Sequence, residues 1–252
     1  MELGIETRWH YGSCEKHGDY ETIQSFMCGG WRGGGCEKCA EERAVEKEQE
    51  ERSERQNARV TSLLNASGIP PRYIDSSLES YIPQNERSGK MLDSLKRYIA
   101  DFKHHRGIGT SIVMSGGVGT GKTHLGASMA HQVIHDYGMK AHFTTVIKMV
   151  RRIRATYNRD SRESEEMVLD YFMNRDLLII DEIGVQSGSD HEHNTIFEII
   201  NERYADMKPT ILLSNEGIEE LTKVLGERII DRFRDGGAVM NFDWESYRGK
   251  NK

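Results

Sequence analysis

The chain contains 252 residues with a mass of 28.8 kDa, which is enough for one α/β domain and a small module beside it. It is 37% hydrophobic, it has no run of about 18 or more apolar residues, and residues 1–10 lack the pattern of a signal peptide, so we exclude a membrane span and expect a cytoplasmic protein. A formal net charge of -6 and a pI near 6.0 exclude the overall positive charge of a protein that always binds duplex DNA, so any contact with nucleic acid must be local.

Residues 1–40 contain all four cysteines but few aliphatic side chains, so this segment needs more than a hydrophobic core to fold. In a reducing cytosol, clustered cysteines favour metal binding over disulfides. Two pairs of residues have the spacing of a zinc ribbon, Cys14-x-x-His17 and Cys36-x-x-Cys39. We therefore predict a small module with a structural, tetrahedral Zn²⁺ bound by Cys14, His17, Cys36 and Cys39. Cys28 could replace His17 as the fourth ligand, and metal-free thiols are the alternative.

The next segment is rich in charged helix formers, with opposite charges at helical spacing such as Glu48 and Arg52. This pattern predicts a solvated linker helix. Gly68, Pro70 and Pro71 end it, because proline lacks a backbone donor and restricts the residue before it. The predicted organisation is a zinc-binding module at 1–40, a charged linker helix at 41–66 and a third, larger domain at 67–252.

Short apolar runs recur through the third segment, separated by helical patterns such as 89–104, 124–137 and 193–207. They occupy residues 111–115, 141–145, 177–181, 210–214 and 238–242. Short buried strands that alternate with helices are typical of βαβ units. The sequence therefore predicts an α/β fold with a parallel sheet.

Residues 116–123 match the phosphate-binding pattern G-x-x-x-x-G-K-[ST], and they lie between a predicted strand and a predicted helix. In such a loop the backbone N–H groups point at phosphate oxygens, at the positive end of the helix dipole. Lys122 is expected to reach the β and γ phosphates, and the Thr123 hydroxyl to bind Mg²⁺. The predicted ATP-binding residues are Gly116, Gly117, Val118, Gly119, Thr120, Gly121, Lys122, Thr123 and His124, together with Asp181.

Two carboxylates, Asp181 and Glu182, end the apolar run at 177–181 and so should lie at the edge of the sheet where ligands bind. We expect Asp181 to hold Mg²⁺ and Glu182 to orient and deprotonate the attacking water. The alternative for Glu182 is a capping role in the next element. Asn215 ends a neighbouring strand and is a candidate sensor of the γ-phosphate, although asparagine at a strand end is also a common turn residue.

These motifs together resemble the DnaC-type helicase loaders over about residues 67–248. The narrower signatures are Leu-Gly-Glu-Arg-Ile-Ile-Asp-Arg-Phe-Arg at 225–234 and Phe-Asp-Trp-Glu-Ser-Tyr-Arg at 242–248. The resemblance implies an AAA+ fold with a five-stranded parallel sheet, ATP-dependent self-association, and loading of a DnaB-type helicase onto single-stranded DNA. The short segment after the last predicted strand leaves no room for the helical lid of many AAA+ proteins.

The resemblance also implies an arginine that acts on the γ-phosphate bound by a neighbouring subunit. By motif match this is Arg232, with Arg228 one helical turn earlier as the reserve; surface ion pairing is the alternative for both. A basic segment at 148–162 surrounds Tyr157 and is a candidate for contact with single-stranded DNA, through Arg151, Arg152, Arg154 and Tyr157. The alternative is a solvated helix face. Residues 187–193 are a second candidate contact.

The leading hypothesis is therefore a helicase-loading ATPase. An accessory ATPase of transposition, similar to the IstB group, shares the same motifs and is the first alternative. The second alternative is a DNA-binding adaptor that uses ATP only as a structural ligand. The cysteine-rich module departs from the helical N-terminal domain with which some loaders bind the helicase, so the docking of the partner could differ.

Overall fold

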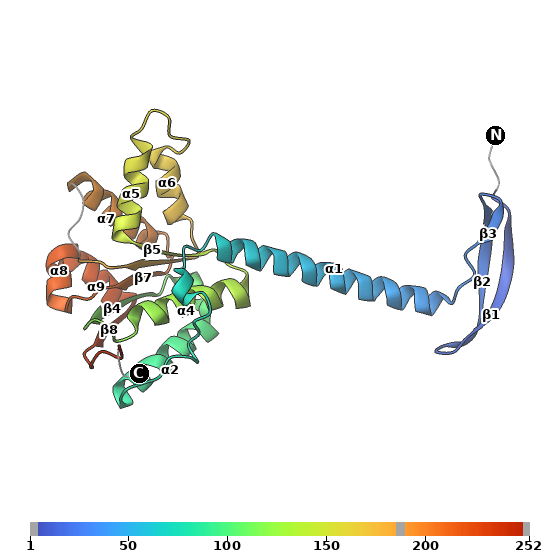
Figure 1. Cartoon of the computed structure of the whole chain (residues 1–252), viewed down its shortest axis with the longest axis horizontal. Helices are drawn as coiled ribbons and strands as arrows, with labels where there is room; N and C mark the ends of the chain where they lie inside the picture. The colour runs from blue at the N-terminus through green and yellow to red at the C-terminus, as the bar shows by residue number, and fades with distance from the viewer. Residues whose placement is uncertain (1–4, 185–189, 249–252) are drawn as a thin grey trace. The chain divides into compact units, whose positions relative to one another are not determined.

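The computed structural model describes residues 5–184 and 190–248, and contacts divide the chain into two units, Met1–Ala58 and Arg59–Lys252. Figure 1 shows the elements of each unit. No helix in the described part of the chain is long and apolar enough to cross a membrane.

The first unit is a three-stranded antiparallel sheet followed by the start of a long helix. The strands are β1 (Thr7–Cys14), β2 (Gly18–Met27) and β3 (Gly30–Arg32), in the order β1-β2-β3. Helix α1 (Glu37–Asn65) begins earlier than the predicted linker helix, so Cys39 lies within its first turn. Among residues 5–58, Cys36 alone is buried. The sheet therefore has no hydrophobic core of its own.

The second unit contains a five-stranded parallel sheet, which confirms the predicted fold. Its order is β5-β6-β7-β4-β8. All four neighbouring pairs are parallel. The strands are β4 (Ser111–Gly116), β5 (Ala141–Thr145), β6 (Leu177–Asp181), β7 (Thr210–Leu213) and β8 (Gly237–Phe242).

Helices cover both faces of this sheet and enclose two hydrophobic cores (Figure 1). Alternate strand residues enter opposite cores: Ile112 and Met114 pack in one, and Val113 in the other. The first face carries η1 (Pro71–Tyr73), α2 (Glu86–Ala100), α3 (Phe102–Ile108) and α4 (Lys122–Tyr137). The second carries α5 (Val146–Thr156), α6 (Glu165–Met173), α7 (Asp190–Ala205), α8 (Ile218–Leu225) and α9 (Glu227–Asp235). Residues 243–248, the last that are described, contain no helix.

A single buried arginine anchors α7 to the elements around it. Arg203 donates to the carbonyl oxygens of Phe172, Met173, Arg175 and Pro209 and to the Thr210 hydroxyl, at 2.6 to 3.0 Å. Burial lowers the pKa of Arg203 to about 9, and no carboxylate accepts a hydrogen bond from it in the described part of the chain. Because the carbonyls satisfy its donors, the cation stabilises the packing of α7 against the end of α6 and the start of β7.

His142 on the edge strand β5 predicts a loss of stability in acid. Its pKa is lowered to about 4, chiefly by burial and also by the charges of Arg175, Arg152 and Lys148, although a hydrogen bond to the Ala66 carbonyl acts to raise it. As the pH falls below the usual histidine pKa of about 6.5, His142 binds a proton in the unfolded chain but stays neutral in the folded chain. Stability that is fully present above pH ~6.5 should therefore fall by about 1 to 2 kcal/mol by pH ~5.

Unfolding in urea at both pH values, followed by far-UV circular dichroism, measures this loss. The matched variant is His142→Gln, which keeps a side-chain donor for the Ala66 carbonyl but cannot titrate. We expect the variant to lose less stability than the parent between the two pH values. Equal losses in both proteins would show that other groups dominate the acid response.

Candidate functional site

The phosphate-binding loop connects the end of β4 to the first residue of α4, as the sequence predicts. Gly116 and Gly121 have φ values of +125° and +98°. A Cβ at Gly116 would lie 2.4 Å from the Phe242 carbonyl oxygen, and one at Gly121 would lie 2.4 Å from the Tyr81 ring. These two positions require glycine for both their backbone angles and their close contacts.

Aromatic residues outside the loop hold it in place through hydrogen bonds. The Tyr81 hydroxyl and the Trp244 indole N–H both donate to the Thr120 carbonyl oxygen, at 3.0 and 3.2 Å. The backbone N–H of Tyr247 donates to the carbonyl oxygen of Gly119 at 2.9 Å. Because these bonds satisfy loop carbonyls and hold the loop in place, they help to keep its N–H groups available for an anion.

Lys122 is a buried cation that fits a phosphate group. Its Nζ donates to the carbonyl oxygens of Gly116 and Gly117, at 2.8 and 2.7 Å. The pKa of Lys122 is lowered to about 8, chiefly by burial and to a smaller extent by the charge of Arg248, although the charge of Asp181 acts to raise it. A phosphate beside this buried ammonium group would stabilise its positive charge.

Asp181 and Thr123 form the pair of oxygen ligands expected for Mg²⁺. The Thr123 hydroxyl donates to Asp181 Oδ2 at 2.8 Å, and the backbone N–H of Glu182 donates to Oδ1 at 2.7 Å. Burial raises the pKa of Asp181, whereas these two hydrogen bonds act to lower it. A hydroxyl and a carboxylate beside the phosphate loop are a donor set that suits Mg²⁺ bound to a triphosphate.

Glu182 follows in a conformation that is unusual for a non-glycine residue, with φ at +60°. Such strain is typical of functional sites, where the surrounding structure over-determines the backbone. Glu182, Asp181 and Asn215 line the same cavity of about 600 Å³ as the phosphate loop. Asn215 is exposed, whereas Ser214 before it is buried and donates to the Ile183 carbonyl oxygen, which is a structural role. The sequence-predicted loop, acids and asparagine are thus brought together.

The cavity has further lining that the motifs did not reveal. It comes from residues 72–84 before α2 and from Tyr247 and Arg248 near the end of the described chain. Residues 72–84 match no phosphate-site pattern, so no signal marked them. Tyr247 and Arg248 belong to the closing motif at 242–248, and this was the signal that could have placed them.

The two candidate interface arginines lie apart from this cavity and differ in their surroundings. Arg232 Nη1 donates to Asn201 Oδ1 at 2.5 Å, and its guanidinium lies 4.9 Å from the centre of the Tyr204 ring. Arg228 is exposed and makes no hydrogen bond or ion pair with another side chain in the described part of the chain. Neither lines the cavity of its own chain.

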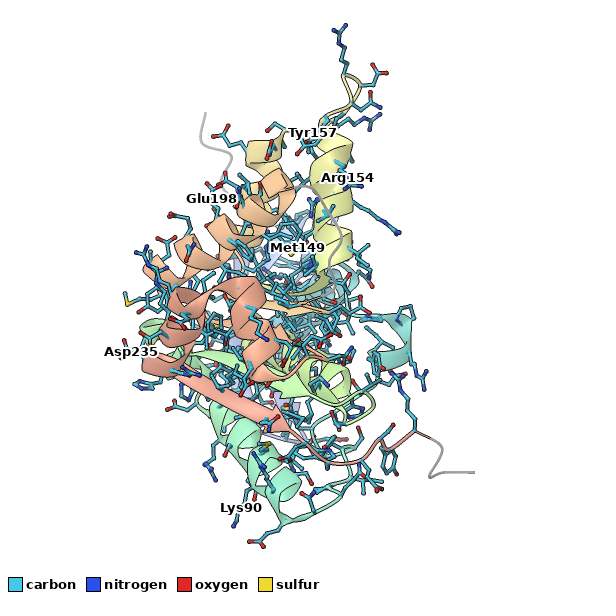
Figure 2. The ribbon with its side chains drawn as sticks, turned by 90° about the vertical axis from the view of Figure 1, so that its left-hand side faces the viewer. Lys90, Met149, Arg154, Tyr157, Glu198 and Asp235 are labelled. Carbon is cyan, nitrogen blue, oxygen red and sulfur yellow. The ribbon has the colours of Figure 1, made fainter. Side chains whose placement is uncertain are left out.

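The candidate DNA-contacting residues lie on α5 and just after it. Figure 2 shows that Arg154 and Tyr157 lie farther from the sheet than Met149, toward the outer end of α5. Arg151 is exposed. Arg152 is bound within the α5–α6 hairpin instead, through two hydrogen bonds to Glu163 at 3.1 and 2.6 Å and through its position 3.9 Å from the Tyr171 ring centre. Of the second candidate contact, residues 187–189 lie outside the described residues and 190–193 are described by their backbone alone.

A separate cluster in the first unit brings together Cys14, His17, Cys36 and Cys39, whose ligand atoms all lie within 4.8 Å of one another. Cys39 Sγ lies 3.4 Å from Cys14 Sγ and 3.2 Å from His17 Nδ1. For the usual bond lengths, a tetrahedral Zn²⁺ site has S–N and S–S edges of about 3.5 and 3.8 Å, so these separations lie within a few tenths of an ångström of what zinc needs. Cys28 is exposed in the turn between β2 and β3 and is not part of the cluster.

The surroundings of the cluster also suit a metal. His17 turns Nδ1 toward the thiols, and its Nε2 lies 3.1 Å from a Glu42 carboxylate oxygen, which would fix the ring as in many zinc sites. Backbone N–H groups of Lys16 and His17 and the thiol of Cys39 lower the pKa of Cys14, while the same Cys14–Cys39 hydrogen bond raises the pKa of Cys39. The two sulfurs therefore share one proton, which a bound zinc would displace.

Comparisons with known proteins agree with this fold. The family model of the IstB-like ATP binding protein matches residues 38–252. The chain is 36% identical over 200 residues to the replicative helicase loader DnaC of Escherichia coli (strain K12), covering 78% of this chain and 80% of that one. It is 37% identical over 191 residues to the uncharacterized protein YdaV of the same strain, covering 75% of each.

Solved structures show the same fold. A crystal structure of the DnaC helicase loader has a TM-score of 0.61 at 22% identity and covers 68% of this chain and 99% of that chain. A crystal structure of DnaI has a TM-score of 0.56 at 20% identity, covering 71% and 94%.

Proposed function

The chain belongs to the family of IstB-like ATP-binding proteins and is related to the helicase loader DnaC, and from this premise we propose that it is a Mg-ATP-dependent ATPase that loads a DnaB-type replicative helicase onto single-stranded DNA. One observation carries the enzymatic part: the phosphate loop, the Thr123–Asp181 pair and Glu182 line one cavity. The similarity to DnaC over 78% of the chain supports the loading part.

In the proposed reaction the loop N–H groups and Lys122 bind the β and γ phosphates. Thr123 and Asp181 hold Mg²⁺, which when bound offsets charge on the phosphate oxygens. Glu182 accepts the proton of the attacking water, and Asn215 orients that water or the γ-phosphate. Hydrolysis then ends the ATP-bound, assembled state and releases the partner.

Self-association completes the site in this proposal. Arg232, with Arg228 as the reserve, reaches the γ-phosphate bound by a second copy of the chain, where a guanidinium stabilises the charge of the transition state. The position of both residues outside the cavity of their own chain supports an action in trans.

We assign the contact with single-stranded DNA to the outer part of α5. Arg151 and Arg154 would follow the phosphates, and Tyr157, which is 53% exposed, would stack on a base. Arg152 has a supporting role, because its bonds to Glu163 brace α5 against the loop before α6. The module in the first unit binds Zn²⁺ through Cys14, His17, Cys36 and Cys39 as a structural site.

Co-purification tests the loading function. With ATP present, the tagged chain is expected to retain a DnaB-type helicase, and the Lys122→Ala variant is expected to lose both nucleotide and helicase. If the helicase is not retained under any nucleotide condition, the loader function is wrong and the ATPase assignment is unaffected. If Lys122→Ala binds ATP as tightly as the parent, the nucleotide site itself is wrong.

The family description, IstB-like ATP binding protein, is also consistent with the other candidate, an accessory ATPase of transposition. Its expected partner is a transposase instead of a helicase. The same co-purification with a transposase in place of the helicase distinguishes the two, because each candidate predicts retention of one partner and not of the other.

A further inference from the structure

The interface arginine Arg232 is held in place by two residues of another helix. Asn201 on α7 accepts a hydrogen bond from its Nη1 at 2.5 Å, and the ring of Tyr204, one turn later on α7, lies 4.9 Å from the guanidinium carbon. The first contact fixes one corner of the guanidinium, and the second supports its flat face through a cation–π interaction. Together they restrict the orientation of the group more than either contact alone.

The guanidinium keeps donors for another partner. Its Nε and Nη2 make no hydrogen bond within the described part of the chain, so the edge that carries them is available to an acceptor outside the protomer. A phosphate oxygen of a second copy is such an acceptor, and two donors in a fixed plane suit it well.

Helix α7, which provides these contacts, is itself held firmly by the rest of the protein. Arg203 lies between Asn201 and Tyr204 in the sequence and points the opposite way, into the protein, where it donates to four carbonyl oxygens and one hydroxyl. Ile199 and Ile200 are buried in the hydrophobic core of the same face. A support of this kind holds a side chain more precisely than a surface loop would.

From these contacts we infer that Asn201 and Tyr204 are positioning residues, which hold Arg232 in the orientation in which it acts on ATP bound by a second copy of the chain. The inference rests on the proposed action of Arg232 in trans and adds the residues that prepare it. A side chain that is already oriented loses less rotational freedom when the neighbouring phosphate arrives, so the contacts lower the barrier of the chemical step and leave ATP binding unchanged.

Steady-state phosphate release by the assembled full-length protein, with kcat and KM for ATP measured separately, tests the inference. Arg232→Ala is expected to lower kcat about 10³-fold. Asn201→Ala is expected to lower kcat about tenfold and to change KM for ATP by less than about twofold. The reason is that it loosens only the Arg232 guanidinium, which acts on ATP bound by a second copy. Tyr204→Leu should lower kcat about fivefold, and Tyr204→Phe, which keeps the ring face, should restore most of it.

The double variant separates positioning from a merely structural effect. If Asn201 acts through Arg232, then adding Asn201→Ala to Arg232→Ala should change kcat by less than about twofold. Glu202→Ala is the matched control, because Glu202 is an exposed neighbour on the same helix whose side chain makes no hydrogen bond or ion pair within the described residues. The midpoint of thermal unfolding and the affinity for an ATP analogue should match the parent in every variant compared.

Two sets of results would overturn the inference, and they differ. If Arg232→Ala lowers kcat but Asn201→Ala does not, or if Asn201→Ala costs the same factor in the Arg232→Ala background, positioning is wrong and the proposed function survives. If Arg232→Ala leaves kcat unchanged, or if Arg228→Ala alone removes the activity, the assignment of Arg232 fails and the positioning role fails with it.

Discussion

Replacement of Glu182 by glutamine is expected to slow ATP hydrolysis by about 10² to 10⁴-fold, the usual contribution of a general base, while ATP binding is retained. The reason is chemical: the amide has nearly the same shape as the carboxylate, but it cannot accept the proton of the attacking water. Because φ of Glu182 is +60° and its N–H donates to Asp181, an isosteric change is required so that the backbone stays in place. Phosphate release and the binding of a fluorescent ATP analogue measure the two effects separately.

The same experiment decides between an ATPase and an adaptor that uses ATP only as a structural ligand. An adaptor predicts that the parent releases phosphate as slowly as Glu182→Gln, with or without single-stranded DNA. An ATPase predicts a large difference, and the variant should then accumulate the ATP-bound assembly together with its partner. Asp181→Asn serves as the comparison, since it should weaken the hold on Mg²⁺ and thus lower activity at limiting magnesium.

The sheet was predictable because its inner strands, β4, β6 and β7, are buried on both faces and form short apolar runs in the sequence. The phosphate loop was predictable because few sequences allow the close contacts at Gly116 and Gly121. By contrast, the single helix expected at 89–104 is divided at Asp101, whose backbone leaves the helical region with φ at −112° and ψ at 34°. The residues on both sides of Asp101 favour a helix, so helix propensity alone did not indicate the break.

The rest of the site depends on contacts between residues distant in the sequence. Charge and spacing placed Arg152 with Arg151 and Arg154 as a candidate DNA contact. In the structure, however, Arg152 binds Glu163 and packs on Tyr171 within the α5–α6 hairpin. The sequence favoured His17 as the fourth ligand but could not exclude Cys28, and only the fold places the first in the cluster and the second in an exposed turn. Pattern thus identified the residue types of the site, whereas their partners required the three-dimensional structure.

Removal of zinc is expected to unfold the strands of residues 7–32 and to leave the ATP-binding unit intact. Cys36 is the one buried residue among residues 5–58, so hydrophobic burial contributes little to the stability of this sheet. Zinc binding in comparable small modules supplies about 10 to 16 kcal/mol of folding free energy, which would far exceed any other stabilising contribution in this unit. A chelator, or the variant Cys39→Ser, should therefore abolish the β-sheet signal of this unit in NMR spectra of the full chain.

Cys28→Ser is the matched control, because Cys28 is exposed and lies outside the cluster. It should retain one zinc ion for each chain in metal analysis and keep the sheet signals, whereas Cys39→Ser should lose both. The nucleotide affinity of both variants should equal that of the parent, because the phosphate loop, Thr123 and Asp181 all belong to the second unit. If the sheet stays folded after complete removal of the metal, the cluster is not what folds it, and hydrogen bonds such as those from Tyr20 to Gly34 and from Arg8 to Gln24 must suffice. If Cys28→Ser loses the metal as well, then the fourth ligand is Cys28 and His17 has been assigned wrongly.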